Sequence, residues 1–445
     1  MNADNRTFIF SSYHFDGQKK LLSLKYSFDD EYYFEEKIEF LGSETPLTDE
    51  HLSALDRVFK YLHLICGISY YKLFIPPTIK INTFTLNEEE AKFFDNFYLR
   101  GLGEFSYRNN ITDMEKRIKF PFKKNIINHA LKYKLTDRKF IAVGGGKDSI
   151  VSIEILKKYY EELALISVNA VAPIRNTMKI SGLKSFQIER TISKNIIELS
   201  KTMGYNGHVP ISGILAFIFL AAGIIYDFDT VILSNEKSAN IGNVVFCGKT
   251  INHQWSKSFE FEKLFNEFCG KFIIESFNYV SFLRPLSEIC IARLFSKYKQ
   301  YHGAFTSCNH AFKIENRIEN WCCDCDKCRF VFLILSVFIN KKELINIFGK
   351  NLFEDKSQLN GYRELCGLRS FKPFECVGEI KESVYAILRT KDDFKNDYIV
   401  KEIRKELEGV ELNKIDEDIF KLTENNNLLS KELFNILKKE TAGFF

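Results

Sequence analysis

Hydrophobic and polar positions change their spacing along the chain, and the first change falls near residue 130. Before it, alternating segments such as "TFIFSSYHF" and "EEKIEFLG" predict strands. The segment "HLSALDRVFKYLHLICGISYYKLF" has the spacing of an amphipathic helix. We therefore expect an N-terminal α+β domain over residues 1–130.

Residues 131–345 alternate between strand-like and helix-like segments. The pattern predicts strands at 138–143, 163–171 and 230–233, and helices at 149–160 and 183–203. Strands that alternate with helices are typical of an α/β domain with a doubly wound parallel sheet and right-handed crossovers. Residues 346–445 are charged and are expected to be mostly helical.

One segment, "VPISGILAFIFLAAGIIY" at 209–226, is almost wholly apolar. It is short for a bilayer, has a proline at its second position and is followed directly by a turn and a strand. We therefore predict a buried helix. The N-terminus lacks the layout of a signal peptide, so we expect a cytoplasmic protein that does not bind a membrane.

The charge balance gives no sign of a nucleic-acid partner, although a local basic patch stays possible. The chain has 445 residues, with 62 Lys and Arg against 58 Asp and Glu, a net charge of +4. No long basic run occurs, so we expect no nucleic-acid partner. The sequence makes no prediction of an oligomeric state.

The stretch "RKFIAVGGGKDSIVSIEIL" at 138–156 predicts a strand, a glycine-rich turn and a helix. Glycines let backbone amides approach a phosphate closely, and a helix N-terminus adds unpaired N–H groups. The spacing fits neither a Walker A loop nor GxGxxG. The alternative is a tight turn in which Asp148 or Ser149 caps the helix.

Eleven cysteines are present, and five of them lie between residues 308 and 328. Cys308 with the C-x2-C-x2-C set Cys322, Cys325 and Cys328 suits a closed, tetrahedral, structural zinc site. Cys323 is left over and could replace Cys322 as the fourth ligand. The alternative is a set of reduced thiols around a turn.

Polar residues cluster in four further segments. "VILSNEKSANIGN" places Asn235 and Glu236 after a strand, where ligands of open α/β sheets bind. "INHQWSKSFEFE" supplies Asn252, His253, Gln254, Trp255, Ser256 and Lys257; "NGHVPISG" supplies His208; "GLGEFSYRNN" supplies Glu104, Tyr107 and Arg108. The alternatives are turn chemistry, a helix cap for His208 and a polar loop for the last segment.

The glycine turn resembles the SGGxDS loop of the N-type ATP pyrophosphatases, with Gly144 in place of the leading serine. "FLRPLSE" at 282–288 is similar to another segment of these enzymes. The resemblance implies a PP-loop fold, like that of the adenine nucleotide alpha hydrolases, and cleavage of ATP to AMP and pyrophosphate. It assigns pyrophosphate binding to Gly144, Gly145, Gly146, Lys147, Asp148 and Ser149, with Asp148 as the Mg²⁺ ligand.

A narrower resemblance covers about residues 60 to 340. In order, "YLHLICGISYYK", "GLGEFSYRNN", "VGGGKDSIVSIE", "GHVPISGI", "SNEKSAN", "NHQWSKS", "FLRPLSE", "SCNHAF" and "WCCDCDKCRFVFLIL" are similar to the ATP-dependent UDP-N-acetylmuramoyl-L-alanyl-L-glutamate epimerases, the MurL family. Lys237 departs from the family, where a tryptophan is expected. The first 50 and last 90 residues match only loosely.

This resemblance implies a small-molecule nucleotide–peptide substrate whose terminal L-glutamate is inverted through an acyl-adenylate, for peptidoglycan synthesis. Arg284 would clamp a phosphate or the substrate carboxylate, and His253, Lys257 and Glu236 are the candidates for proton transfer. The remaining polar residues would bind substrate: His208, Asn235, Asn252, Gln254, Trp255 and Ser256.

Other functions remain open at the level of sequence. One is another adenylating enzyme that modifies a nucleobase or tRNA, because deazaguanine synthases have a similar cysteine-rich ending. Another is an epimerase or ligase that acts on a different peptide. A third is a zinc-ribbon binding protein that keeps the loop without turnover.

Overall fold

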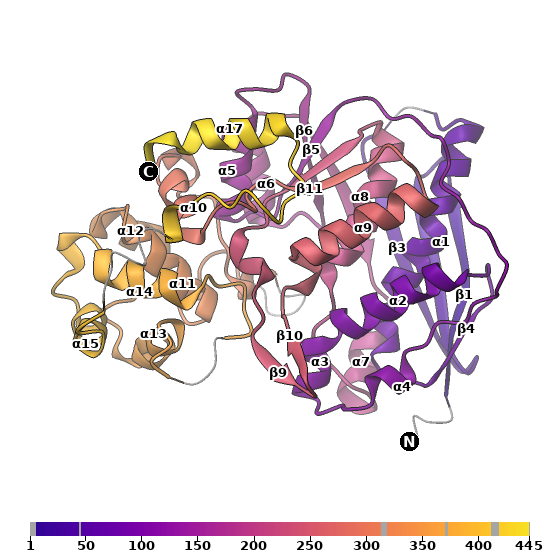
Figure 1. Ribbon diagram of the computed structural model, residues 1–445, viewed down its shortest axis with the longest axis horizontal. Coiled ribbons are helices and arrows are strands. Elements are labelled where there is room, and N and C mark those ends of the chain that lie inside the picture. The colour runs from indigo at the N-terminus through magenta and orange to yellow at the C-terminus, as the bar shows by residue number, and fades with distance from the viewer. Residues whose placement is uncertain (1–5, 44–45, 313–317, 370–372, 411–417, 445) are drawn as a thin grey trace. The chain divides into compact units, whose positions relative to one another are not determined.

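The computed structural model describes residues 6–43, 46–312, 318–369, 373–410 and 418–444. These residues form a mixed α/β structure with one large, mostly parallel sheet (Figure 1). Its strand order is β11-β8-β5-β6-β7-β3-β2-β1-β4. The strands are β1 (Thr7–Asp16), β2 (Leu21–Phe28), β3 (Tyr32–Phe40), β4 (Thr78–Ile81), β5 (Lys139–Ala142), β6 (Leu163–Val168), β7 (Ser185–Thr191), β8 (Thr230–Leu233) and β11 (Asn278–Ser281).

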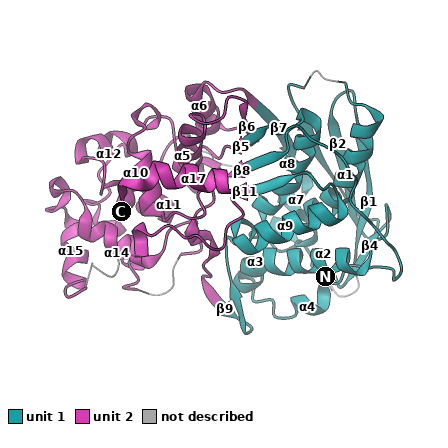
Figure 2. Cartoon of the chain, turned by 45° about the horizontal axis from the view of Figure 1, so that its top comes forward, with its two compact units in different colours: residues 1–140, 186–231, 245–279 teal, residues 141–185, 232–244, 280–445 magenta. Residues whose placement is uncertain are grey.

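The chain divides into two compact units (Figure 2). Unit 1 comprises residues 1–140, 186–231 and 245–279, and unit 2 comprises residues 141–185, 232–244 and 280–445. Each unit is assembled from segments far apart in the sequence, whereas the domains expected at 1–130, 131–345 and 346–445 are consecutive. The three-domain division stays a prediction.

The strands of unit 1 begin with a three-stranded antiparallel arrangement. β1 pairs with β2 and β2 with β3, and a tight turn between β2 and β3 places Asp29 and Asp30 at φ values of 53° and 54°. Asp tolerates this left-handed conformation because its short side chain bonds locally; Asp30 accepts a hydrogen bond from Ser27 Oγ at 3.0 Å. β4 adds to β1 in parallel, and β3 pairs with β7 antiparallel.

The helices of unit 1 include α1 (Asp49–Tyr71), α2 (Glu88–Gly101), α3 (Gly103–Arg108), α4 (Met114–Arg117) and α9 (Phe259–Phe272). The short strands β9 (Val244–Phe246) and β10 (Lys249–Ile251) pair in a separate two-stranded sheet. The capping box of Thr48 and His51 starts α1, and that of Asn87 and Glu90 starts α2. Both helices therefore begin where their side chains satisfy free backbone N–H groups.

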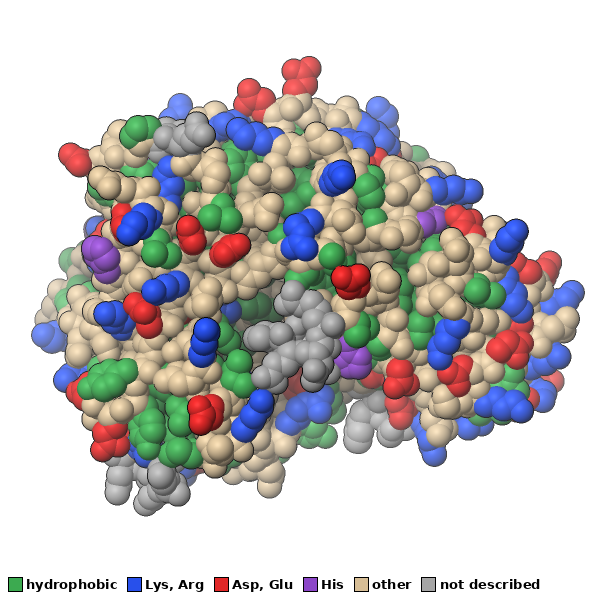
Figure 3. Space-filling model, turned by 180° about the vertical axis from the view of Figure 1, so that it is seen from behind, with side chains coloured by type: hydrophobic (Ala, Val, Ile, Leu, Met, Phe, Trp, Pro, Cys, Tyr) green, Lys and Arg blue, Asp and Glu red, His purple; other side chains and the backbone are tan. Residues whose placement is uncertain are grey.

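The apolar segment forms the buried helix α8 (Ile211–Tyr226), which packs against α1 inside unit 1. This confirms the expectation of a buried helix. Among the described residues, no helix is both long and apolar enough to cross a bilayer. On the face shown in Figure 3, basic and acidic side chains are interspersed over the described residues.

The prediction of a helix at 183–203 is wrong for the first half of this segment. Gly182, at φ 72°, ends α6 (Ala172–Ser181), and β7 follows before α7 (Asn195–Thr202) begins. In β7, Phe186 and Ile188 are buried while their neighbours are more exposed, which is the two-residue period of a strand. Pairing with β3, a partner far away in the sequence, decides the conformation.

The sheet order shows a switch point beside β5. The chain passes from β5 to β6 on one side, and β8 lies on the other side of β5. The N–H of Val143 donates to Ile166 and that of Phe282 to Leu233, as expected for parallel neighbours. The expected α/β class with a mostly parallel sheet is confirmed, but the antiparallel β1–β3 strands make the whole sheet mixed. The doubly wound PP-loop fold stays a prediction.

The described C-terminal residues are mostly helical, as expected. The helices of unit 2 include α5 (Lys147–Leu156), α10 (Glu288–Phe295), α11 (Asp326–Leu335), α12 (Lys341–Phe348), α13 (Leu359–Leu365), α14 (Ile380–Arg389), α15 (Tyr398–Glu406) and α17 (Lys431–Thr441). α11 packs against α10, α12, α13 and α14. Its residues from 330 to 335 are all buried, so it forms the centre of a continuous apolar core.

Candidate functional site

The glycine turn between β5 and α5 is shaped by close packing. Gly145 has φ 75°, and a Cβ there would lie 3.0 Å from the backbone N of Ile174. A Cβ on Gly146 would lie 2.7 Å from Ser307 Oγ, whereas one on Gly144 would meet nothing within 4 Å. Glycine is therefore needed at the second and third positions, where backbone lies against backbone or against a short side chain.

The first turn of α5 carries no side-chain cap. Gly146 is the N-cap residue, and Ser149 Oγ donates to the Gly146 carbonyl at 3.1 Å instead of capping an N–H. The interpretation of Asp148 or Ser149 as the helix cap is therefore wrong. Uncapped amides and the positive end of the helix dipole suit an anionic ligand.

Lys147 is 1% exposed and forms ion pairs with Asp148 and Glu288. Burial by itself lowers the pKa of Lys147, but the charges of the two carboxylates outweigh it, so the pKa is raised and the ammonium stays protonated. Its positive charge is paired with these two carboxylates inside the protein. The donors that the turn itself offers to an anionic ligand are therefore its backbone amides.

Glu288, also 1% exposed, is a residue that sequence reasoning missed as part of the site. Burial raises its pKa, and the charge of Lys147 opposes that shift. The carboxylate of Glu382 accepts hydrogen bonds from the N–H groups of Glu288 (2.6 Å) and Ile289 (3.4 Å), and burial raises the pKa of Glu382 to about 6. Helix α14 thus holds the start of α10, and with it Glu288. The only sequence signal was the last letter of "FLRPLSE".

Three predicted site residues meet at the ends of β8 and β11 in unit 2. Asn235 Nδ2 and Arg284 Nη2 both donate to Ser281 Oγ, at 3.0 and 3.1 Å. Arg284 Nη1 donates to the Glu236 carbonyl at 3.2 Å, and Arg284 is 2% exposed. Arg284 therefore supports the loop that carries Glu236, whose carboxylate accepts a hydrogen bond from Ser238 Oγ.

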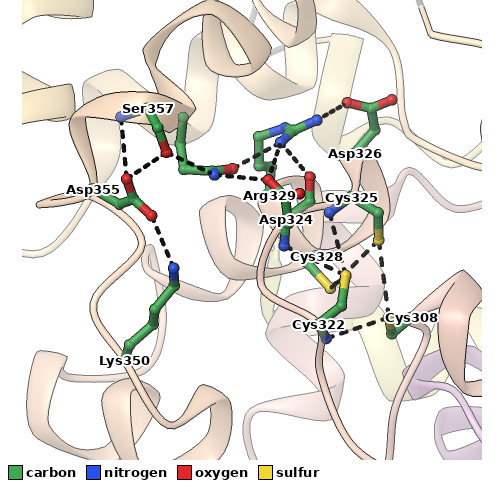
Figure 4. A network of polar contacts seen from close by, with 11 residues as sticks. Cys308, Cys322, Asp324, Cys325, Asp326, Cys328, Arg329, Lys350, Asp355 and Ser357 are labelled. Carbon is green, nitrogen blue, oxygen red and sulfur yellow. Dashed lines mark hydrogen bonds and ion pairs between the residues drawn. The ribbon is translucent and has the colours of Figure 1, made fainter. Parts of the chain in front are cut away.

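The sulfur atoms of four cysteines converge in unit 2 (Figure 4). The Sγ–Sγ distances are 4.0 Å for Cys308–Cys325, 3.6 Å for Cys322–Cys328 and 3.5 Å for Cys325–Cys328. All four atoms lie within 4.8 Å of one another. Cys323 points elsewhere, with Sγ 3.2 Å from the Phe348 carbonyl. Cys322 is thus the fourth member, and four thiolates in this arrangement fit a tetrahedral zinc ion.

The cysteine cluster is continuous with the glycine turn. The N–H of Thr306 donates to the Gly145 carbonyl at 3.1 Å, and Ser307 lies against Gly146. Cys308 follows directly in the sequence. A group that holds Cys308 in place therefore also holds the segment that supports the turn.

A second cluster lies in unit 1, and its centre is Glu104, which the sequence placed in a polar segment without assigning it a role. Glu104 on α3 forms a short hydrogen bond through Oε2 with His253 Nδ1, and His208 Nδ1 lies 3.5 Å from the same oxygen. The two imidazole rings are 4.6 Å apart. Arg108 Nε donates to the other oxygen, Oε1.

Electrostatics keep the members of this cluster in different charge states. Burial, and next the charge of His253, lower the pKa of His208 to about 4, so this ring is neutral near pH 7. Burial raises the pKa of Glu104, but the hydrogen bond and charge of His253 outweigh it and the pKa is lowered. An ionised carboxylate therefore lies between two imidazoles.

The rest of the "NHQWSKS" segment is built into unit 1 around the short helix η3 (Trp255–Lys257). Trp255 is 4% exposed and packs edge-on against Phe97 and Phe261. Asn252 Oδ1 accepts from the N–H of Gln254, and the N–H of Lys257 donates to the Gln254 carbonyl. Gln254 Oε1 and Trp255 Nε1 are buried without a hydrogen-bond partner among the described residues. Ser256 is buried as well.

The predicted site residues thus fall into two groups. Gly144 to Ser149, Asn235, Glu236, Arg284 and the cysteines belong to unit 2, whereas His208 and residues 252–257 belong to unit 1. Their roles in binding and catalysis stay predictions.

Comparison with known proteins identifies the family. The family model described as the MurL N-terminal domain matches residues 1–282, and that of the MurL C-terminal domain matches residues 304–418. A protein of Xanthomonas oryzae pv. oryzae is 36% identical over 406 residues, which cover 90% of each chain. Proteins of Micromonospora and Salinispora tropica are 38% and 37% identical, with 84% and 85% of this chain covered and 84% of each relative. All three are named UDP-N-acetyl-alpha-D-muramoyl-L-alanyl-L-glutamate epimerase. The chain belongs to the MurL family of epimerases.

Proposed function

We propose that this protein is an ATP-dependent epimerase that inverts the terminal L-glutamate of UDP-N-acetylmuramoyl-L-alanyl-L-glutamate to D-glutamate, for peptidoglycan synthesis. The observation that carries the proposal is the similarity to three epimerases of this name over 84–90% of the chain. The glycine turn supports the use of ATP, because its uncapped helix start suits a phosphate.

In the first step, an oxygen of the glutamate α-carboxylate, the one beside the α-proton, bonds to the α-phosphorus of ATP. The bond to the β-phosphate breaks, pyrophosphate leaves and an acyl-adenylate remains. The amides of residues 144–149 would hold the leaving pyrophosphate. Asp148 is the fitting Mg²⁺ ligand of the turn, because its side chain is 25% exposed and offers carboxylate oxygen. Mg²⁺ bound there would offset phosphate charge.

Activation makes the α-proton acidic enough to remove. Removing the α-proton beside an ionised carboxylate would place a second negative charge next to the first. An acyl-adenylate removes the carboxylate charge and offers an oxygen on which an enolate forms. Proton removal, return of a proton to the opposite face and hydrolysis then yield the D-isomer and AMP. His253, Lys257 and Glu236 are the candidate proton-transfer groups.

The four cysteines would hold a structural zinc ion. Cys308, Cys322, Cys325 and Cys328 leave no open ligand position in a tetrahedral site, so the metal would not act on substrate. It would instead fix the segment of Thr306 and Ser307 against the turn.

Incubation of the L-glutamyl substrate with ATP and Mg²⁺ in D₂O tests the proposal. We expect one AMP and one pyrophosphate per product, deuterium at the glutamyl α-carbon and D-glutamate after acid hydrolysis. An ATP analogue with a methylene bridge between the α- and β-phosphates is the matched control and should give no product. D-Glutamate formed without AMP would contradict the acyl-adenylate, and AMP formed without deuterium would favour a different adenylating enzyme.

A further inference from the structure

Three segments that are distant in the sequence place Glu104, His208 and His253 together within unit 1. Glu104 is 5% exposed, whereas the two histidine side chains are 24% and 15% exposed. The carboxylate is therefore held inside the protein, and the rings lie nearer to solvent. Such an order of burial is expected when a carboxylate acts on a ligand through a histidine instead of touching it.

The contacts determine which ring nitrogen can react. Both rings turn Nδ1 toward Oε2 of Glu104. A histidine that donates Nδ1–H to a carboxylate keeps its lone pair on Nε2, at the opposite edge of the ring. Glu104 therefore selects one tautomer of His253 and stabilises the charged ring that forms when Nε2 takes up a proton.

Charge around the cluster favours this role over metal binding. Glu104 is the carboxylate shared by the two rings, and Arg108 binds its other oxygen. The ammonium groups of Lys257 and Lys72 lower the pKa of His208 further. These cationic side chains, one on Glu104 and two near His208, oppose a divalent cation, whereas they attract an anionic substrate.

We infer that Glu104 is a positioning residue for α-proton transfer, and that it acts through His253. The inference rests on the proposed function. The lone pair of His253 Nε2 forms a bond to the α-proton as the Cα–H bond breaks, and the C–H electrons pass into the enolate of the acyl-adenylate. Glu104 stabilises the imidazolium, which later releases this proton to solvent. A solvent-exchangeable donor protonates the opposite face.

The test separates proton transfer from activation of the substrate in the full-length protein. Glu104→Gln keeps the side-chain size but removes the charge. We expect substrate-dependent AMP and pyrophosphate formation in the first turnover to stay within about threefold of wild type, whereas deuterium exchange at the α-carbon falls about 1000-fold. Glu267→Gln, an exposed glutamate that pairs with Lys263 on α9, makes the same change elsewhere in unit 1 and should leave both rates unchanged.

The pH profile is the readout that a merely structural role would not move. Without the carboxylate charge, a protonated ring is less favoured, so the acidic limb of the exchange rate in Glu104→Gln shifts to lower pH. His208, Arg108, Lys72 and Lys257 also face this cluster and are unchanged in the variant. If Glu104→Gln does not fold, His253→Ala decides: added imidazole should restore part of the exchange.

Three results would overturn the inference. The first is exchange in folded Glu104→Gln at the wild-type rate with an unmoved pH limb. The second is equal loss of pyrophosphate release and exchange. The third is a metal ion, measured in the wild-type protein, that is lost in both Glu104→Gln and His208→Ala. A wild-type protein that forms no AMP with the substrate would instead refute the proposed function.

Discussion

In unit 2, Lys147 and Glu288 are each 1% exposed and pair with each other beside the glycine turn. In unit 1, Glu104 is shared by His253, His208 and Arg108, and the side chain of His208 remains 24% exposed. In the first cluster, Lys147 and Glu288 are buried and paired with each other, so the donors that the turn offers to a ligand are backbone amides. The second keeps titratable rings near solvent.

This difference matches the two parts of an epimerisation that begins with activation. Binding a polyphosphate needs fixed donors whose charge does not change during the reaction. Proton transfer needs a group that changes its charge and is held in one tautomer. Substitutions confined to one unit show whether each unit can be disturbed without the other.

Asp148→Asn should have the largest effect. We expect substrate-dependent pyrophosphate release to fall about 100- to 1000-fold, because the variant loses the carboxylate proposed as the Mg²⁺ ligand of the turn. Release is measured with a coupled phosphate assay. Asp137→Asn removes an 83% exposed carboxylate that pairs with Lys139, and it should have no effect. Unchanged release in Asp148→Asn would show that the turn does not bind ATP.

Cys325→Ser and Cys323→Ser separate the cluster from its unused neighbour. We expect zinc affinity to fall at least about 100-fold in Cys325→Ser, because one of the four proposed thiolate ligands is lost. Zinc content after dialysis, measured by mass spectrometry, should stay near one per chain in Cys323→Ser. Loss of zinc in Cys323→Ser would instead place Cys323 among the metal ligands.

Gly146→Ala and Gly144→Ala compare two adjacent positions of the turn. A Cβ at 146 must displace Ser307 Oγ, which is 2.7 Å away, whereas a Cβ at 144 meets open space. Overpacking of this kind costs about 1–3 kcal/mol, so KM for ATP should rise about 10-fold in Gly146→Ala. Steady-state kinetics would contradict this geometry if Gly144→Ala were the more damaged variant.

The smallest expected effect is on stability in acid and concerns unit 1. Burial lowers the pKa of His63 to about 4, from an ordinary value of 6.5. Between these values the unfolded chain takes up a proton that the folded chain does not, so stability falls as pH falls from 6.5 toward 4. From pH 7.5 to 5.5 we expect a loss of about 1 kcal/mol from this group.

Thermal unfolding at the two pH values measures it. The loss should be smaller in His63→Gln than in wild type, and unchanged in His14→Gln, because His14 is exposed on β1. An equal loss in all three proteins would show that His63 becomes protonated in the folded state.

Sequence patterns predicted the elements whose signal is local. The glycine turn, α8 and the cysteine spacing each lie within one short segment, and each formed the predicted local structure. The strand β7 was missed because its partner β3 lies about 150 residues away in the sequence, and pairing outweighed the helical composition of 183–203. Glu288 and Glu382 were missed because the local sequence around a helical glutamate does not show whether its side chain is buried or exposed to solvent.

The sequence by itself determined the glycine turn between a strand and a helix, the four-cysteine cluster up to the choice between Cys322 and Cys323, and the resemblance to the MurL family that the family comparison confirmed. Only the tertiary structure decided that Lys147 is paired inside the protein, that Cys322 belongs to the cluster and that Glu104 joins His208 and His253. The physical reason is the distance along the sequence between the residues that interact. Backbone turns and ligand spacings are set by neighbouring residues, whereas a charge acquires its partner and its pKa only when distant segments meet out of water.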